Sequence, residues 1–173
     1  MSNSEIQDDY AAQRTKRADK ATEQQRRAAN PAHCVWVEAS AGTGKTKVLS
    51  DRVLRLLLND VNPIRLLCLT YTKAAAVEMQ SRITQRLSDW AVKDEADLDK
   101  DLNKLLGNEI KSAQEARSYR QKARTLFAKL LDAPGGIKVQ TIHSFCTDVL
   151  KRFPLEAGVS PYFEVLEDET ETF

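Results

Sequence analysis

The sequence has no apolar run long enough to cross a membrane, and its polar N-terminus lacks a signal-peptide core. Its three cysteines, Cys34, Cys68 and Cys146, are odd in number and far apart, which argues against a disulfide or zinc framework. The two histidines, His33 and His143, are not spaced as metal ligands. These absences predict a cytoplasmic protein with no membrane association, whose three thiols are buried and free.

The chain also has no large excess of positive or negative residues. The net charge is +1, so any nucleic-acid site must be local rather than a property of the whole surface. Hydrophobic residues make up 42% and charged residues 29% of the 173 residues, which is typical of one globular domain with a core. Residues 1–20 are polar without apolar periodicity, and we interpret them as a solvated tail.

The most informative stretch is Ala-Ser-Ala-Gly-Thr-Gly-Lys-Thr at 39–46. It follows an apolar run at 34–37 that predicts a strand, and it precedes an amphipathic run at 47–58 that predicts a helix. Strand, glycine-bearing loop and helix form the context of a phosphate-binding loop (P-loop), in which backbone N–H groups and the helix start face phosphate. Lys45 supplies a cation for the β- and γ-phosphates, and Thr46 a hydroxyl for Mg²⁺.

One position departs from the general pattern, because Ala39 stands where glycine is usual. Ala39 must therefore keep an ordinary backbone conformation, while Gly42 and Gly44 keep the loop tight. The predicted nucleotide-binding residues of the loop are Ala39, Ser40, Ala41, Gly42, Thr43, Gly44, Lys45 and Thr46. The bland alternative is a chance glycine-rich turn with an exposed lysine.

Upstream of the loop, Thr22-Glu23-Gln24-Gln25 has the form of a capping box and predicts a short helix ended by Asn30-Pro31. Gln25 has two interpretations that the residues leave open. It closes the capping box, or its amide, with one donor and one acceptor, faces the donor–acceptor edge of adenine.

Two further strand–loop–helix units follow. Residues 66–70 predict a central parallel strand covered on both faces, followed by loop 71–73 and a helix over 74–90. Residues 137–142 predict a strand and residues 143–153 a helix. Between the two units, residues 91–133 predict one or two amphipathic helices with a solvated charged face. Repeated βα units imply a parallel sheet whose strand ends collect ligands at loops 39–46, 71–73 and 141–144.

Each predicted helix has an expected inward face. For the helix after the P-loop it is Val48, Leu49, Val53, Leu56 and Leu57, widened by Leu54 and Leu58, with Ser50, Asp51, Arg52 and Arg55 opposite. For 74–90 it is Ala76, Met79, Ile83, Leu87 and Trp90. For 91–133 it is Leu102, Leu105, Leu106, Tyr119, Leu126, Phe127, Leu130 and Leu131, and for 143–153 it is Phe145, Val149, Leu150 and Phe153.

Taken in order, these pieces resemble the N-terminal motor region of UvrD-like superfamily 1 DNA helicases, and within them the AddA/RecB branch. Residues 22–28 resemble the family's Q motif, and 39–46 its first helicase motif, where a leading alanine is usual. Residues 70–79 resemble motif Ia, although Lys73-Ala74 stands where the family often has Asn-Lys, and 141–146 resemble motif Ib. The segment 153–158 also resembles the continuation found in AddA. The long 91–133 segment between motifs Ia and Ib favours the AddA/RecB branch.

The resemblance implies an α/β fold: a RecA-like P-loop motor domain, a parallel sheet with flanking helices, partial, over 21–173 with a helical insertion at 91–133. It implies ATP and Mg²⁺ as cofactors, with Gln25 as the adenine reader, Lys45 and Thr46 as catalytic residues and Thr46 on Mg²⁺ through ATP. It implies single-stranded and duplex DNA as partners, contacted by Thr72, Lys73, Thr141, His143 and Ser144, and an AddB-like protein as a further partner. For Thr72, Thr141 and Ser144 the alternative is helix capping by the same hydroxyls.

The implied function is an ATP-dependent DNA helicase, 3′ to 5′, in double-strand-break repair. The chain shows no acidic residue at the end of a suitable strand, no second motor domain and no nuclease domain. We therefore expect an N-terminal ATP-binding fragment that is inactive alone and has an unpaired sheet edge. The rival hypothesis is a stand-alone P-loop nucleotide-binding module without motor activity. Continuation of the reading frame into a second motor domain would distinguish the two.

Overall fold

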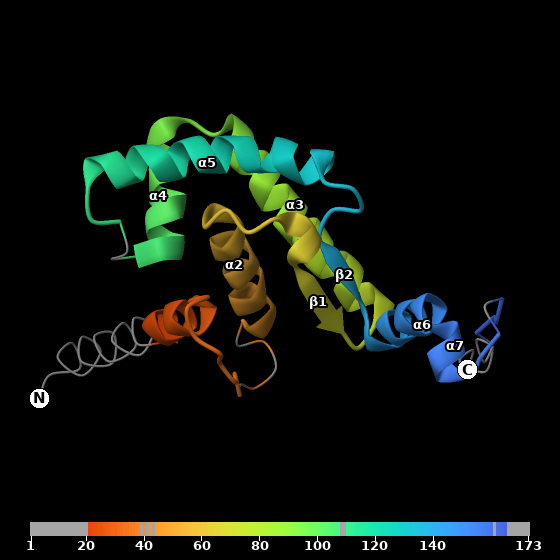
Figure 1. Ribbon diagram of the computed structural model, residues 1–173. Helices are drawn as coiled ribbons and strands as arrows, with labels where there is room; N and C mark the ends of the chain where they lie inside the picture. Colours follow the sequence, from red (N-terminus) through yellow and green to blue (C-terminus); the bar gives the residue numbers. More distant parts are fainter. Residues whose placement is uncertain are drawn as a thin grey trace, which may run out of the picture.

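The computed structural model describes residues 21–38, 40, 42, 44–107, 110–160 and 162–165. In these residues the helices are a helical stretch over 21–29, α2 (Lys45–Leu58), α3 (Lys73–Val92), α4 (Glu95–Leu106), α5 (Ala113–Asp132), α6 (Ile142–Arg152), the short α7 (Pro154–Ala157) and the 3₁₀ turn η1 (Pro63–Arg65). The strands are β1 (Leu67–Thr70) and β2 (Lys138–Thr141). The described chain is thus mostly helical, with a small sheet between α2 and α6 (Figure 1).

The sheet of the described residues consists of β1 and β2, which pair in parallel with Leu67 opposite Lys138 and Thr70 opposite Thr141. A parallel pair needs a long crossover, and α3, α4 and α5 supply it. The prediction that β1 is covered on both faces is wrong for this chain, because Leu67 and Leu69 are exposed on one face. Residues 34–37 have no strand assignment and are exposed, which corrects the strand predicted before the P-loop.

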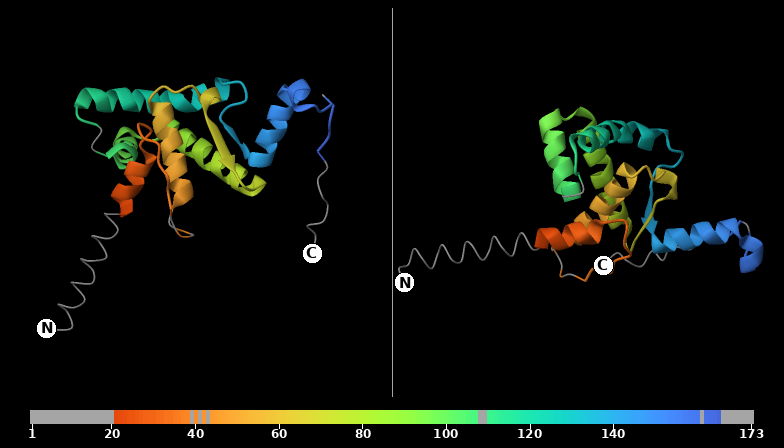
Figure 2. Two further views of the ribbon diagram at one scale, coloured as in Figure 1. Left: turned by 60° about the horizontal axis from the view of Figure 1, so that its bottom comes forward. Right: turned by 60° about the vertical axis from the view of Figure 1, so that its left-hand side comes forward.

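The hydrophobic core is built from α2, α3, α4 and α5, and α5 lies across the ends of α2 and α3 (Figures 1 and 2). Its fully buried large side chains are Leu54, Leu57, Leu58, Ile83, Leu87, Trp90, Leu98 and Leu102. The predicted inner face of α3 is confirmed, since Ala76, Met79, Ile83, Leu87 and Trp90 are all buried. Residues 91–133 therefore supply two of the four core helices, α4 and α5, although Leu131 at the end of α5 is exposed.

The helix α2 is buried on most of its surface, including its polar side. Ser50, Asp51 and Arg55 are buried while Leu49 is exposed, which corrects the predicted division into an apolar and a solvated face. Ion pairs explain the burial of Asp51, which accepts from Lys47 at 2.6 Å and from Arg86 of α3 at 2.8 Å. Ser50 and Arg55 donate to the backbone carbonyls of Thr46 and Arg26. Leu56, expected in the stripe, packs against the core while partly buried.

The helix α6 leaves the body instead of packing on it (Figure 1). None of its residues is buried, Phe145 is half-buried, and Val149, Leu150 and Phe153 are exposed. Their predicted inward orientation is wrong for this chain, because no described element covers that side of α6.

Local details also differ from the sequence predictions. Residue 21 is already helical, so Thr22 lies within the helical stretch and is not its N-cap as predicted. The helix ends before Asn30, as predicted. Cys34 and Cys146 are exposed, which corrects the prediction of three buried thiols. Cys68 is half-buried on β1, and burial raises the pKa of its thiol. No described helix has the length and apolar content needed to cross a membrane.

Candidate nucleotide site and strand-end groove

The start of α2 differs from the starts of the other long helices. The helices α3, α4, α5 and α6 have a side-chain oxygen that caps a backbone N–H, from Thr72, Asp94, Ser112 and Thr141 respectively. Gly44 precedes α2 in the left-handed conformation (φ 91°, ψ 22°) and has no side chain that could cap. The first turn of α2 also lacks an acidic residue. This helix start is therefore open to an anionic ligand from outside the chain.

Lys45 lies at this open start. Its Nζ donates to the backbone carbonyl of Ser40 at 2.8 Å, which folds the side chain back along the loop. The residue is exposed, as is Thr46. The ammonium group is thus held against the loop backbone at the exposed start of α2. A lysine at this place can reach a phosphate bound by the loop.

Gln25 lies beside the same loop. A Cβ placed on Gly44 would be 3.1 Å from Nε2 of Gln25, so the amide almost touches the glycine that precedes Lys45. The helical residues 21–29 and the loop are therefore neighbours, and the predicted Q-motif glutamine lies next to the predicted phosphate site. This position is compatible with the proposed contact between Gln25 and adenine, which stays a prediction.

The loop backbone fits a phosphate. Gly42 and Gly44 both have positive φ, +78° and +91°, which is the conformation that turns successive N–H groups inward. A Cβ on Gly42 would meet nothing within 4 Å, so space is open beside the loop. The predicted residues Ala39, Ala41 and Thr43 lie outside the described residues. Among the described residues, no cluster of three or more His, Cys, Asp or Glu side chains could hold a metal ion.

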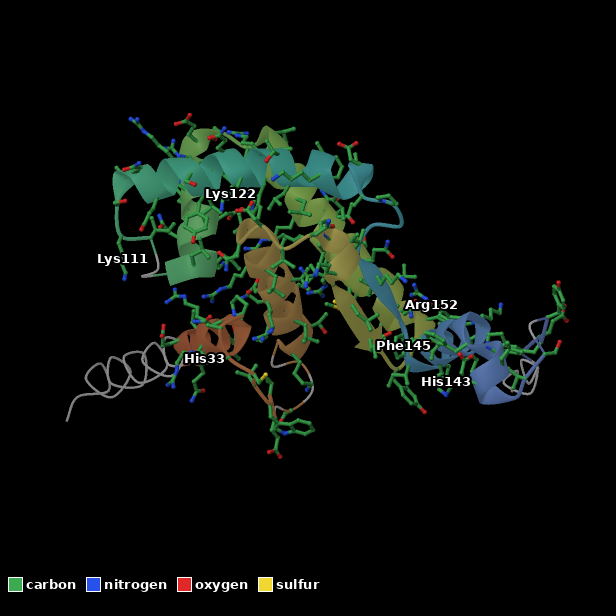
Figure 3. The ribbon with its side chains drawn as sticks, viewed as in Figure 1. His33, Lys111, Lys122, His143, Phe145 and Arg152 are labelled. Carbon is green, nitrogen blue, oxygen red and sulfur yellow. The ribbon has the colours of Figure 1, made fainter. Side chains whose placement is uncertain are left out.

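A second site lies where β1 and β2 end. A groove of about 730 Å³ is lined by Tyr71, Lys73, Thr141, His143, Ser144, Thr147, Asp148, Lys151, Phe163, Glu164 and Val165. It brings together four of the five residues predicted to contact DNA, Lys73, Thr141, His143 and Ser144, from two segments far apart in the sequence. Figure 3 shows His143 on the side of α6 that lies away from the body.

The threonines at these strand ends cap helices, which was the alternative interpretation. The Thr72 hydroxyl accepts from the N–H of Ala75 at 3.1 Å, and Thr141 accepts from the N–H of Ser144 at 3.1 Å. The hydroxyl groups of Thr141 and Ser144 also lie 2.9 Å apart. Capping leaves the O–H of Thr72 available as a donor, so capping and phosphate contact are compatible for that residue.

Several residues near the two sites were not assigned a role from the sequence. Tyr71 and Lys151 line the groove, and the Lys151 ammonium lies 6.0 Å from the ring centre of Phe163. Arg52 and Arg55 of α2 bond backbone carbonyls in and after helix 21–29. The leucines of α2 already predicted burial on much of its surface, but no local pattern indicated which carbonyls the two arginines contact.

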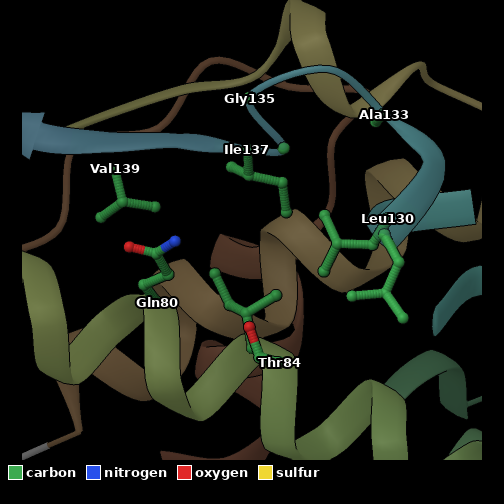
Figure 4. A pocket seen from close by; sticks show the side chains of 10 residues that line it. Gln80, Thr84, Leu130, Ala133, Gly135, Ile137 and Val139 are labelled. Atoms are coloured by element: carbon green, nitrogen blue, oxygen red, sulfur yellow. The ribbon is translucent and has the colours of Figure 1, made fainter. Parts of the chain in front are cut away.

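Another cavity lies away from both sites. It has a volume of about 340 Å³ and lies between α3, the end of α5 and β2, lined mainly by apolar side chains with Gln80 and Thr84 (Figure 4). Neither the P-loop nor the strand-end residues line it, so it does not belong to either candidate site.

Comparison with known proteins identifies the family to which this chain is similar. The family model described as the UvrD/REP helicase N-terminal domain matches residues 21–172. A protein of Lactobacillus johnsonii that is named as an ATP-dependent helicase/nuclease subunit is 37% identical over 137 residues, which are 79% of this chain and 9% of the relative. Proteins of the same name from Clostridium acetobutylicum and Enterococcus faecalis are 36% identical over 87% of the chain and 34% over 80%. The chain spans about a tenth of the length of these relatives.

Proposed function

This chain belongs to the UvrD/REP helicase family, and we propose that it is the ATP-binding front of an AddA-type ATP-dependent DNA helicase. The observation that carries the proposal is the position of Gln25 against Gly44, next to the uncapped, lysine-bearing start of α2. Gln25, which we propose for the base, and Lys45, which we propose for the phosphates, therefore both lie next to Gly44. The rival hypothesis, a nucleotide-binding module without motor activity, is not favoured, because the matched relatives are named as components of a helicase/nuclease.

In the proposed site, the N–H groups at the start of α2 and around Gly42 bind the phosphates of ATP. Lys45 leaves the Ser40 carbonyl and moves onto the β- and γ-phosphates, while the Thr46 hydroxyl holds Mg²⁺. Mg²⁺ held there would supply positive charge to neutralise the phosphates. Gln25 supplies the amide that accepts from and donates to adenine.

The groove at the ends of β1 and β2 is the proposed contact with DNA. Lys73 offers a cation and Ser144 a hydroxyl, which suit phosphate contacts that do not depend on base sequence. Because the groove and the P-loop belong to one RecA-like motor domain in this proposal, closure around ATP shifts the grip on the strand. Movement from 3′ to 5′ is part of the proposal, by analogy with the family.

The remaining domains follow from the same proposal. The predicted tail, residues 1–20, lies outside the described residues. In this proposal 21–173 are the first part of the motor domain, with 91–133 as a helical insertion. The second motor domain and the nuclease domain belong to the longer cytoplasmic protein that carries this chain, and an AddB-like protein is its partner. An acidic Mg²⁺ partner and an arginine finger come from that longer protein, so the chain alone should hydrolyse ATP very slowly.

The test measures ATP hydrolysis and strand separation by the full-length protein, with and without single-stranded DNA. We expect DNA-stimulated hydrolysis and ATP-dependent separation, and both should disappear in Lys45→Ala, which excludes a contaminant. ATP binding without hydrolysis or strand separation would favour the stand-alone binding module. Hydrolysis at the normal rate in Lys45→Ala would reject the P-loop assignment.

A further inference from the structure

Two arginines of α2 connect the helix that follows the P-loop to the segment that carries Gln25. The Arg52 guanidinium donates to three carbonyls, those of Ala28 at 3.4 Å, Asn30 at 2.7 Å and His33 at 2.7 Å. Arg55 donates to the carbonyl of Arg26 at 2.9 Å. These four carbonyls belong to the last turn of helix 21–29 and to the turn after it.

The chemistry of this contact is that of a helix C-terminus. The last carbonyls of a helix have no partner inside it and carry the negative end of the helix dipole, so a guanidinium satisfies them by charge and by its forked donors. Arg52 uses both Nη1 and Nη2 in this way. A lysine at that position could not reach all three carbonyls at once, because its donors sit on a single nitrogen.

The Arg55 contact is buried, and both arginines lie close to the site. Arg55 is only 2% exposed, and the carbonyl that it bonds belongs to Arg26, the residue directly after Gln25. Arg52 stands seven residues after Lys45, two turns further along the same side of α2. The pocket of about 440 Å³ behind the loop is lined by both Lys45 and Arg52 together with Ala28.

Helix 21–29 also contacts the end of α4. A Cβ on Gly107 would be 3.4 Å from Cδ of Arg26, so the backbone after α4 contacts that side chain. Helix 21–29 therefore contacts both α2 and the end of α4. Its distance from the P-loop depends on α2, because α2 carries both the loop lysine and the two arginines.

From this geometry we infer that Arg52 and Arg55 are positioning residues that hold Gln25 against the P-loop and so set the preference for adenine nucleotides. The inference rests on the proposed function, in which Gln25 contacts adenine. The arginines do not touch the nucleotide; they fix the height and rotation of helix 21–29 relative to Gly44. Loss of either arginine should weaken recognition of the base more than binding of the phosphates.

The test is a mutant cycle in the full-length protein, read out by equilibrium binding. Dissociation constants for ATP, GTP and inorganic triphosphate are measured for the wild type, Gln25→Ala, Arg52→Met and the double variant. We expect the preference for ATP over GTP to fall about 10-fold in Gln25→Ala and about 3- to 10-fold in Arg52→Met. The double variant should lose no more than Gln25→Ala, and affinity for triphosphate should change less than about 2-fold.

Arg124→Met is the matched control. Arg124 also donates to carbonyls at the end of a helix, those of Trp90 and Ala91 in α3, but it lies in α5, away from the nucleotide site. It should lower the melting temperature like Arg52→Met and leave the ATP preference unchanged. If Arg52→Met does not fold, Arg52→Lys replaces it and should lower the preference by a smaller factor.

Amide hydrogen exchange provides a second readout, and residues 21–33 should exchange faster in the Arg52 variants than in Arg124→Met. The outcomes distinguish the positioning role of the arginines from the recognition of adenine by Gln25. A normal ATP preference in the Arg52 variants, with the preference lost in Gln25→Ala, overturns the positioning role alone. An unchanged preference in Gln25→Ala, or no preference in the wild type, removes adenine recognition by Gln25 and with it this inference.

Discussion

The two ends of α2 are built in opposite ways. At its C-terminal end, Leu57 and Leu58 are buried, and Lys122 of α5 donates to the Leu58 carbonyl and to Asp60. At its N-terminal end, Gly44 offers no cap and Lys45 and Lys47 lie in the first turn, where positive charge is unfavourable to the helix. One end is completed by the chain itself. The other has no side-chain cap at Gly44, which suits the phosphates of the proposed nucleotide site.

Removing the cation at the open end should give the largest effect. Lys45→Ala is expected to weaken nucleotide binding about 100-fold or more, since a charged contact to the phosphates is lost. Titration with a fluorescent ATP analogue measures the dissociation constant. Lys47→Ala is the matched control, because Lys47 lies in the same turn but pairs with Asp51, so its loss should change binding only a few-fold. Equal losses in both variants would mean that only the general charge of the turn matters.

The next change tests the contact across Gly44. Gly44→Ala places a side chain at φ +91° and within 3.1 Å of the Gln25 amide. The backbone conformation alone should cost about 1–2 kcal/mol in the free energy of unfolding. Gly135→Ala is the control, because Gly135 also has positive φ, +76°, but a Cβ there meets nothing within 4 Å.

Both glycine variants should lose stability in chemical denaturation, and only Gly44→Ala should also change the ATP preference. If Gly135→Ala changes that preference as much, the effect comes from general destabilisation, and the position of Gln25 is not responsible.

A third test compares the open start of α2 with the capped start of α3. Thr72→Ala removes the oxygen that caps Ala75 and should lower the free energy of unfolding by about 1 kcal/mol. Thr72→Asp keeps a capping oxygen, so stability should stay near that of the wild type, while its negative charge should weaken binding of single-stranded DNA several-fold. Normal DNA binding by Thr72→Asp, measured by fluorescence anisotropy, would leave Thr72 with a capping role only.

The smallest effect is expected at the completed end of α2. The hydrogen bond from Lys122 lowers the pKa of Asp60, so the ion pair stabilises the fold above the unfolded pKa of about 4 and is lost as pH falls below it. Because the Asp60 side chain is 56% exposed, Asp60→Asn should cost only a few tenths of a kcal/mol at pH 7. Thermal unfolding should show this difference at pH 7 and none near pH 2. Asparagine also tolerates the φ of 61° at this position.

Periodicity predicted the interior well, because the core of this chain depends on helical spacing. All five inner residues predicted for α3 are buried, and α4 and α5 form where amphipathic runs were found. The loops 71–73 and 141–144 were placed together correctly, since parallel strands end at one edge. Local pattern therefore identified which faces are apolar and which loops meet.

Pattern alone could not identify what covers each apolar face. Val149, Leu150 and Phe153 form a good inward stripe on α6, yet nothing described packs on it. The predictions of a buried Cys34 and of a strand at 34–37 were wrong for the same reason. Burial depends on which elements pack nearby, and the local sequence does not contain that information. The roles of Arg52 and Arg55 depend on distant carbonyls, and charge in a helix usually indicates a solvated side.

The pairing of β1 with β2 also has a consequence for folding. The two strands are separated in the chain by α3, α4 and α5, so closing that loop costs entropy that only an assembled core offsets. We expect the helices, which are joined by short connections, to form first and the strands to pair late. We therefore expect the groove at the strand ends to form after the helical core and to be lost whenever that core opens.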